Sequence, residues 1–291
     1  MPKQLRHICK DIYIINHNED IAQLTRSLLR QGFQVHSIRT AYTAEEERFS
    51  ASQRALINHA KAWETIAKQP HHAVVVEADF VPVQHFGQLP LPAPENQLTS
   101  SFSYLYSVAP EFWDLSPNAG CMRGHAGGMV AYALSSLVAT KLLEFHQQHQ
   151  QISDGTYTTW DAGLGYWLKD RGIQSYIPFR QYGEHGGCGN PEHARAGLRA
   201  TDHADVLMGP LSFLPAYANG SHYRFLKTRL LARTWGWGRL LLGRALSWRN
   251  MRRTRPLAMV GFAAGRLLAL PHMVPHVNHE LAQQASERHT P

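Results

Sequence analysis

Short apolar runs alternate with amphipathic segments over the first 80 residues, and this alternation constrains the fold more than any other feature. Residues 11–16 (DIYIIN) and 73–77 (AVVVE) are almost continuously apolar, as expected of strands buried on both faces, and residues 33–38 alternate like a strand. Residues 19–30 and 52–68 carry apolar side chains at helical spacing. The order strand, helix, strand, helix, strand predicts an α/β fold whose open, mostly parallel sheet has right-handed crossovers.

Beyond residue 80 the pattern predicts further strands and helices, at residues 102–108, 128–133, 174–178, 135–149 and 160–171. Residues 82–100 are rich in Pro, Gln and Ser and predict a loop. Residues 183–203 are dense in Gly, His and Asn and predict irregular structure. Helical patterns of basic character begin at Tyr223.

Charge divides the chain into two parts. Residues 1–205 hold 17 Lys and Arg against 20 Asp and Glu, whereas residues 206–291 hold 12 against 2. No acidic residue lies between Asp205 and Glu280. We therefore expect an α/β domain at 1–205 and a basic helical region at 206–291 that meets an anionic partner.

Simple features argue against several classes of protein. No run of about 18 apolar residues is free of turn formers, and the N-terminus does not read as a signal peptide. Cys9, Cys121 and Cys188 are widely spaced without a C-x-x-C pair, which favours a reducing, cytoplasmic compartment. Neither the glycine fingerprint of dinucleotide-binding enzymes nor a P-loop or G-x-S-x-G motif is present.

Two acidic residues, Glu77 and Asp79, stand at the end of the most apolar predicted strand. Ligands of open α/β sheets bind beyond the carboxyl ends of strands. On an extended segment, residues two apart point to the same side, so both carboxylates could meet a divalent cation that bridges to phosphates. The alternative is that one carboxylate caps a turn while the other is solvated.

Neighbouring motifs favour the metal interpretation. In chain order they are the strand ending at Asn16, NHAKAWETI at 58–66, AVVVEAD at 73–79, GGMVAYALS at 127–135 with KLL at 141–143, and Asp161 with a helix ending in KDRG at 169–172. Over residues 11–180 this series resembles glycosyltransferase family 25, which comprises bacterial lipopolysaccharide glycosyltransferases and collagen galactosyltransferase domains. The chain departs from that family where Asn58 replaces a serine and Ala78 replaces the middle acid of E-D-D.

The resemblance implies a GT-A-like fold, a Rossmann-type α/β/α sandwich that binds a nucleotide sugar. It implies transfer of a sugar, often galactose from UDP-galactose, with inversion, to a lipopolysaccharide or other surface-glycan acceptor. That reaction needs a divalent cation, Mn²⁺ or Mg²⁺, to neutralise the departing diphosphate, and a carboxylate to take the proton of the acceptor hydroxyl. The residues expected to contact the donor are Asn16, Asn58, His59, Glu77 and Asp79, and the expected metal ligands are Glu77, Asp79 and His185.

Asp161 and Asp154 are the candidates for the catalytic base. We favour Asp161 because it opens a predicted helix, where a strand-to-helix junction would face the site. The alternative role for Asp161 is that of a helix N-cap.

The segment that contains His185, Cys188 and His193 admits a second metal interpretation, a soft-metal site in a hydrolase. Zinc sites normally show tighter paired spacing and a fourth ligand. We therefore favour a glycine-rich loop over the nucleotide site, from which His185 reaches the metal.

The C-terminal region combines ten basic residues between Tyr223 and Arg255 with Trp235, Trp237 and Trp248. A basic amphipathic helix with tryptophans is typical of proteins that bind anionic lipid surfaces. The alternatives are a helical cap on the body of the protein and, least favoured, a nucleic-acid contact.

The leading hypothesis is therefore a metal-dependent glycosyltransferase of surface-glycan assembly, cytoplasmic and peripheral at the inner face of the membrane, acting on a lipid-linked or other saccharide acceptor. The alternative is a degenerate transferase fold without activity. It is motivated by Ala78 and by the segment after the first strand, where HNED at 17–20 and the later Arg26 stand in place of the family's L-D-R-x-x-x-R run. That protein would bind anionic membranes or glycans through its basic C-terminal region.

Overall fold

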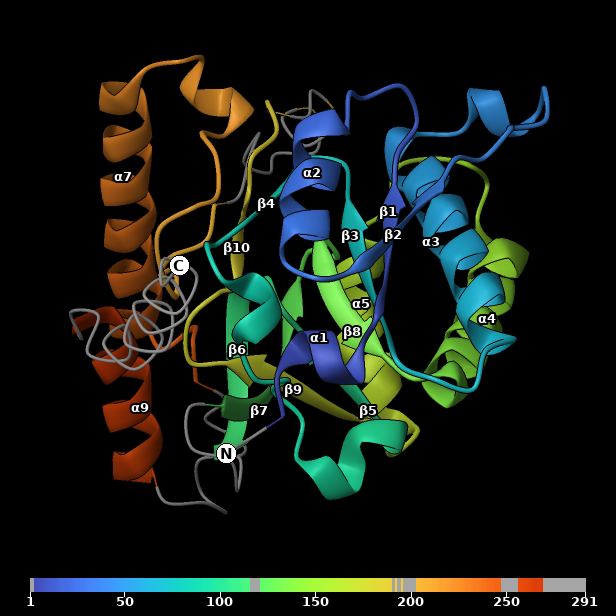
Figure 1. Cartoon of the computed structure of the whole chain (residues 1–291). Helices are drawn as coiled ribbons and strands as arrows, with labels where there is room; N and C mark the ends of the chain where they lie inside the picture. Colours follow the sequence, from blue (N-terminus) through green and yellow to red (C-terminus); the bar gives the residue numbers. More distant parts are fainter. Residues whose placement is uncertain are drawn as a thin grey trace, which may run out of the picture.

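A mixed β-sheet forms the centre of the protein, which we describe from a computed structural model over residues 3–115, 121–189, 192, 195, 203–246 and 256–268. Its strands are β1 (Asp11–Ile15), β2 (Gln34–Ile38), β3 (Ala73–Glu77), β5 (Ser101–Tyr104), β6 (Val108–Leu115), β7 (Cys121–Gly127), β8 (Ala131–Leu134) and β9 (Gln174–Pro178). They lie in the order β2-β1-β3-β8-β5-β9-β7-β6 (Figure 1). Because β7 and β8 run antiparallel to both of their neighbours, six of these eight strands point the same way.

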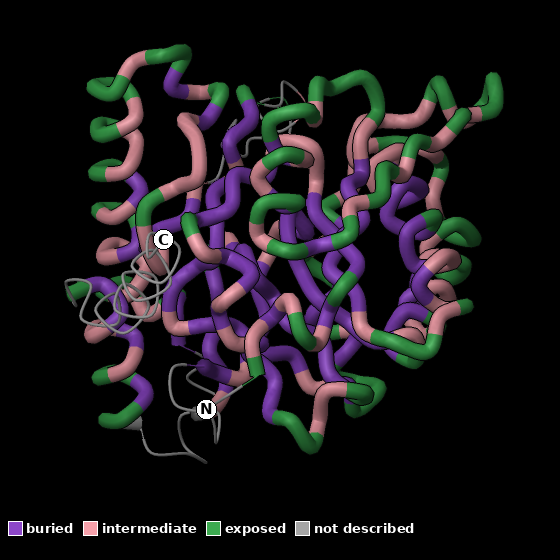
Figure 2. Tube along the Cα trace, viewed as in Figure 1, coloured by how far each residue is buried: buried purple, intermediate pink, exposed green. Residues whose placement is uncertain are grey.

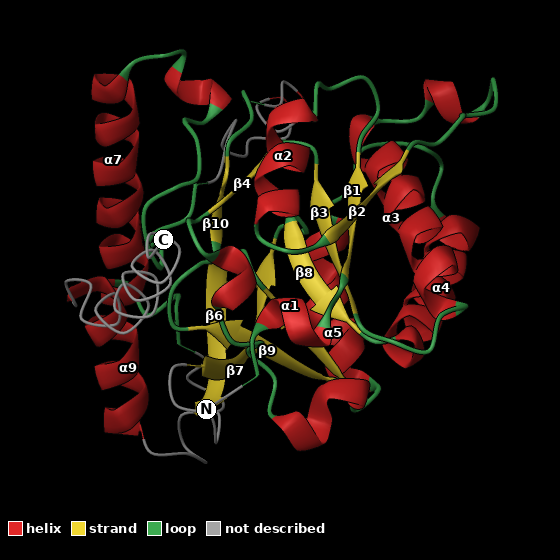
Figure 3. Cartoon of the chain, in the orientation of Figure 1, coloured by secondary structure: helices red, strands yellow, loops and turns green. Residues whose placement is uncertain are grey.

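Helices cover both faces of this sheet (Figure 3). One face packs against α3 (Ala51–Ala67), α4 (Ser136–Ile152) and α5 (Trp160–Asp170), and the other against α1 (Leu5–Ile8), α2 (Ala22–Arg30) and β4 (Phe80–Pro82). Successive residues of a strand point to opposite faces, so Val75 enters the first core and Val74 the second. Burial on both faces explains why β1 and β3 are apolar throughout.

The predicted β-α-β-α-β order of the first 80 residues is confirmed, and the fold is a mixed α/β fold with a mostly parallel sheet. The strand predicted at 102–108 is instead β5 followed by a separate strand, β6. The sequence did not predict β4, β6, β7 or β10 (Gly183–His185). In β7 the polar Arg123 and His125 and two glycines interrupt the apolar pattern, and this composition conceals the strand.

The other predicted elements differ in detail. The expected loop at 82–100 contains two short 3₁₀ helices, Phe86–Gln88 and Glu95–Ser100, and further 3₁₀ turns lie at Glu46–Arg48 and Ala216–Ala218.

Helices α3 and α4 begin where serines cap them, since the Ser50 and Ser135 hydroxyls accept from the backbone N–H three residues later.

Within the described residues, the basic C-terminal region contains the helices α7 (His222–Leu241) and α9 (Pro256–Leu268), which contact each other near their C-terminal ends at the β6 side of the sheet (Figure 1). On α9, Phe262 packs edge-on against Phe112 of β6 and Phe179 after β9. Within the described residues, no helix has both the length and the apolar character needed to cross a membrane.

Candidate metal site

A turn at the carboxyl end of β3 carries the two acidic residues that the sequence singled out. Glu77 is the last residue of β3, and its backbone N–H donates to the Val130 carbonyl at 2.9 Å. Ala78 and Asp79 form a turn that leads into β4. The expected extended geometry across Glu77 and Asp79 is therefore wrong, because the turn, and not strand periodicity, places their carboxylates together.

Strand pairing brings His185 to the same place from a distant part of the chain. β10 pairs antiparallel with β4 and sets His185 opposite Phe80, the residue after Asp79. The Gly186 N–H donates to the Asp79 carbonyl at 2.9 Å. The expectation of irregular structure is thus wrong for 183–185, and His185 lies on a strand instead of a loop.

Glu77, Asp79 and His185 form a cluster with the spacing of metal ligands. One ligand atom from each residue lies within 4.8 Å of the others, and His185 Nε2 is 2.8 Å from Asp79 Oδ2. Asp79 Oδ1 is buried and has no hydrogen-bond partner. A Cβ atom on Gly187 would collide with the Asp79 carboxylate, so glycine leaves the space that this side chain occupies.

The carboxylates around His185 control its protonation. Burial by itself lowers the pKa of His185, but Asp79, Glu77 and Glu184 outweigh it and raise that pKa to about 9. Without a metal, His185 is therefore an imidazolium at neutral pH and forms an ion pair with Asp79. A metal that took His185 as a ligand would displace this proton.

A buried chain of hydrogen bonds holds Glu77 from behind. His59 of α3 is fully buried, and its Nε2 lies 3.2 Å from Glu77 Oε1 while its Nδ1 lies 2.9 Å from the Tyr132 hydroxyl. Trp63 Nε1 donates to the same hydroxyl at 2.8 Å. Because the Glu77 carboxylate can only accept, His59 Nε2–H donates to it, and Nδ1 then accepts from the Tyr132 O–H. Sequence reasoning identified His59 but missed Tyr132 as part of the site.

The two asparagines expected at the donor site have different surroundings. Asn16 follows β1 at the carboxyl edge of the sheet, and its Oδ1 accepts from the Ser37 hydroxyl at 2.6 Å. Asn58 is buried on α3, and its Oδ1 has no hydrogen-bond partner. Asn16 directly follows Ile15, the residue paired with Glu77, but no hydrogen bond among the described residues joins either asparagine side chain to Glu77 or Asp79.

Asp161 lies at the second position of α5, and its Oδ2 accepts from the Gly128 N–H at 2.8 Å. This partner is outside the helix, and the N-cap residue is Thr159, so Asp161 does not have the role of an N-cap. Two residues after Gly128, the Val130 carbonyl accepts from the Glu77 N–H. The segment from Gly128 to Val130 therefore connects Asp161 with the metal cluster. The expected strand-to-helix junction is wrong, because a loop from α4 precedes α5.

Asp154 is exposed in that loop, and its Oδ1 accepts from the hydroxyl (2.6 Å) and the N–H (3.0 Å) of Thr156. These hydrogen bonds, the hydroxyl first, hold the pKa of Asp154 below its usual value. The residue therefore completes a local turn, and no hydrogen bond or ion pair in the described part of the chain joins it to the metal cluster.

The alternative soft-metal site receives no support from the residues that can be described. Cys188 is exposed, and His193 lies outside the described residues. Among the described His, Cys, Asp and Glu side chains, the one group of three that could hold a metal is Glu77, Asp79 and His185.

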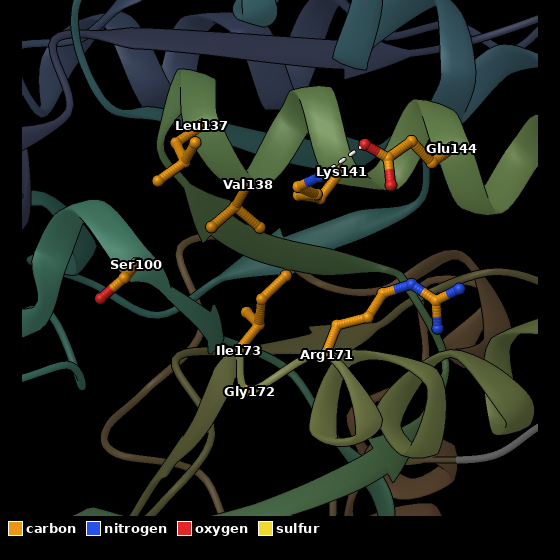
Figure 4. A pocket seen from close by; sticks show the side chains of 8 residues that line it. All are labelled: Ser100, Leu137, Val138, Lys141, Glu144, Arg171, Gly172 and Ile173. Atoms are coloured by element: carbon orange, nitrogen blue, oxygen red, sulfur yellow. Dashed lines mark hydrogen bonds and ion pairs between the residues drawn. The ribbon is translucent and has the colours of Figure 1, made fainter.

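A cavity of about 360 Å³ lies away from this cluster (Figure 4). Its lining comes from the start of α4 and from residues just before β5 and β9, so it opens at the amino edge of the sheet. The lining residues are Ser100, Leu137, Val138, Lys141, Glu144, Arg171, Gly172 and Ile173. The cavity is thus at the edge opposite to the carboxyl end of β3.

Comparison with models of known protein families and with curated proteins gave no match for this chain. The fold and the geometry define the protein as an α/β protein with two carboxylates and an imidazole clustered at the carboxyl edge of its sheet.

Proposed function

We propose that this protein is a metal-dependent glycosyltransferase that transfers a sugar from a nucleotide sugar with inversion. The observation that carries the proposal is the Glu77, Asp79 and His185 cluster at the carboxyl end of β3. Open α/β sheets bind ligands at this edge. The ordered motifs that resemble glycosyltransferase family 25 supply the nature of the ligand, a nucleotide sugar, and the GT-A form of the fold.

The residues present fit a divalent cation. Asp79 Oδ1 is a buried oxygen without a partner, which a cation would satisfy. Two carboxylates and one imidazole suit Mn²⁺, which accepts oxygen ligands together with a histidine nitrogen, better than Mg²⁺, which prefers oxygen alone. When bound, the cation neutralises the diphosphate that leaves the donor.

The protein side chains then have distinct tasks. Glu77 is held in place by the Nε2–H of His59. Asp161 engages one carboxylate oxygen with Gly128, which leaves its other oxygen to accept the proton of the acceptor hydroxyl. We assign UDP-galactose as the first donor to test and a lipopolysaccharide or other surface glycan as the acceptor. A cytoplasmic location supplies nucleotide sugars and suits the three free cysteines.

Calorimetry tests the proposal directly. Titration of the protein with MnCl₂, followed by UDP-galactose and other UDP-sugars with and without Mn²⁺, should show donor binding that depends on the metal. Asp79→Asn and Gly187→Ala should both weaken this binding, the first by removing a charge and the second by pushing a methyl group into the carboxylate.

Glu144→Gln is the matched control, because it neutralises an exposed carboxylate at the opposite edge of the sheet and should leave binding unchanged. The proposal fails if no nucleotide sugar binds in a metal-dependent way, or if Asp79→Asn binds metal and donor as the unmodified protein does.

A further inference from the structure

Helix α7 presents large apolar side chains to solvent. Tyr223, Leu226, Leu230, Leu231 and Leu241 are each between 50% and 81% exposed. A surface helix of a soluble protein normally turns polar residues outward and apolar residues to the core. The tube in Figure 2 shows the same pattern, with few buried positions along this helix. The helix therefore has an apolar face that the described part of the protein does not cover.

Small and charged residues attach the opposite side of α7 to the protein. Ala232 and Gly236 are buried, and a Cβ atom on Gly236 would meet Asp205 and Leu267 of α9. Arg229 forms an ion pair with the buried Glu184. Leu240 also packs against the core of the protein, whereas the other leucines of α7 take no part in this attachment and are left outward.

Positive charge accompanies the apolar face. Arg224 and Lys227 are exposed on the first turns of α7, within the stretch that contains no acidic residue between Asp205 and Glu280. On the adjacent α9, Leu257 is 86% and Leu268 is 68% exposed. A solvent face that combines apolar side chains with cations is complementary to an anionic lipid surface, where the apolar side chains enter the interface and the cations remain with the headgroups.

We propose that the outward face of α7, together with the exposed leucines of α9, binds the surface of an anionic bilayer. This membrane-binding face attaches the protein peripherally. Binding needs neither a metal nor a sugar donor, so the inference stands independently of the proposed transfer activity.

Co-sedimentation of the full-length protein with vesicles tests this proposal. The vesicles are phosphatidylcholine alone or phosphatidylcholine with phosphatidylglycerol, and the buffer contains EDTA so that metal binding plays no part. We expect binding to the anionic vesicles, weaker binding as salt rises, and a blue shift of tryptophan emission on binding.

Two pairs of variants distinguish this face from any other surface. Leu226→Gln with Leu230→Gln should reduce vesicle binding strongly, whereas Leu29→Gln with Leu137→Gln, two leucines about equally exposed on α2 and α4, should leave it unchanged. Arg224→Glu with Lys227→Glu should lower vesicle affinity by about 25-fold or more, because each basic residue contributes roughly fivefold near an anionic surface. The matched control is Arg26→Glu with Arg30→Glu, which reverses two exposed charges on α2.

All substituted positions are exposed, so melting curves should show the fold intact. Three results would overturn the proposal: no binding to anionic vesicles, equal losses in the test and control variants, or a dimer in analytical ultracentrifugation that Leu226→Gln with Leu230→Gln dissociates. The last result would identify the face as a contact between two copies of the chain.

Discussion

Asp79 and Asp161 are two carboxylates with different surroundings. Asp79 faces His185 and keeps a buried oxygen without a partner, whereas Asp161 is held by a single backbone N–H of Gly128. The first arrangement favours a cation, and the second leaves an oxygen for proton transfer. Each residue can therefore be tested by a readout that the other should not affect.

Asp161→Asn should lower turnover by roughly 10²–10⁴-fold, the usual contribution of a positioned acid or base. The amide oxygen can still accept from the Gly128 N–H, so donor and metal binding should stay near the unmodified values. Steady-state kinetics and calorimetry check the two halves of this expectation. Retained turnover in Asp161→Asn together with inactivity of Asp154→Asn would transfer the role of base to Asp154.

His59→Phe should weaken metal binding by about 10–100-fold, the usual cost of losing a residue that orients a metal ligand. The aromatic ring preserves packing against Trp63 and Tyr132, but the bond from Nε2–H to Glu77 is lost. Calorimetric titration with MnCl₂ measures the effect, and an unchanged affinity would show that His59 does not position Glu77.

Helix α9 is joined to the body of the protein by a buried ion pair. Arg266 of α9 donates to both oxygens of Asp205 and also to Gln181 and to the Phe179 carbonyl, next to β9. Burial raises the pKa of Asp205, but Arg266 outweighs it and holds that pKa below the usual value. The ion pair therefore stabilises the folded state at neutral pH. This stabilisation is lost in acid, once the pH falls through the lowered pKa of Asp205 in the folded state.

Asp205→Ala should destabilise the protein by about 3–5 kcal/mol, because it leaves the Arg266 guanidinium buried without its counter-charge. The double variant Asp205→Leu with Arg266→Met should lose less free energy of unfolding than Asp205→Ala, since no uncompensated charge remains. Urea unfolding measures both. If the double variant is less stable than the single one, the pair holds α9 through more than charge compensation.

Over the whole molecule, histidines that are buried or half-buried should shape the dependence of the free energy of unfolding on pH. Burial, as the largest cause, lowers the pKa of His125, His146 and His149. These side chains are protonated more readily in the unfolded chain than in the folded one. The free energy of unfolding therefore falls as pH drops below about 6.5. His185 acts in the opposite direction, because its raised pKa gives stability that is full below about 6.5 and is lost as pH rises toward about 9.

The Tm of the metal-free protein should therefore be highest near pH 6.5 and fall on either side. His125→Phe should reduce the fall in acid, because the new ring still packs against Trp113 and Tyr166 but cannot take up a proton. Glu111 and Lys169, which face His125 and act on its pKa in opposite directions, are retained in this variant. Calorimetric melting curves between pH 5 and 9 check the profile, and the same acid dependence in His125→Phe would exclude His125 as a contributor.

The sequence by itself determined the elements whose signal is local. The apolar runs of β1 and β3 and the helical spacing of α3 appear where they were predicted, because burial on both faces of a strand or on one side of a helix leaves a pattern within a few residues. Tertiary structure alone decided which distant groups meet. His185 reaches Asp79 across 106 residues through the pairing of β10 with β4, and Gly128 reaches Asp161 across 33 residues. It also decided that α7 docks by Ala232, Gly236 and Leu240 and exposes its other leucines, since the choice between two apolar sides of a helix depends on the shape of the surface that receives it.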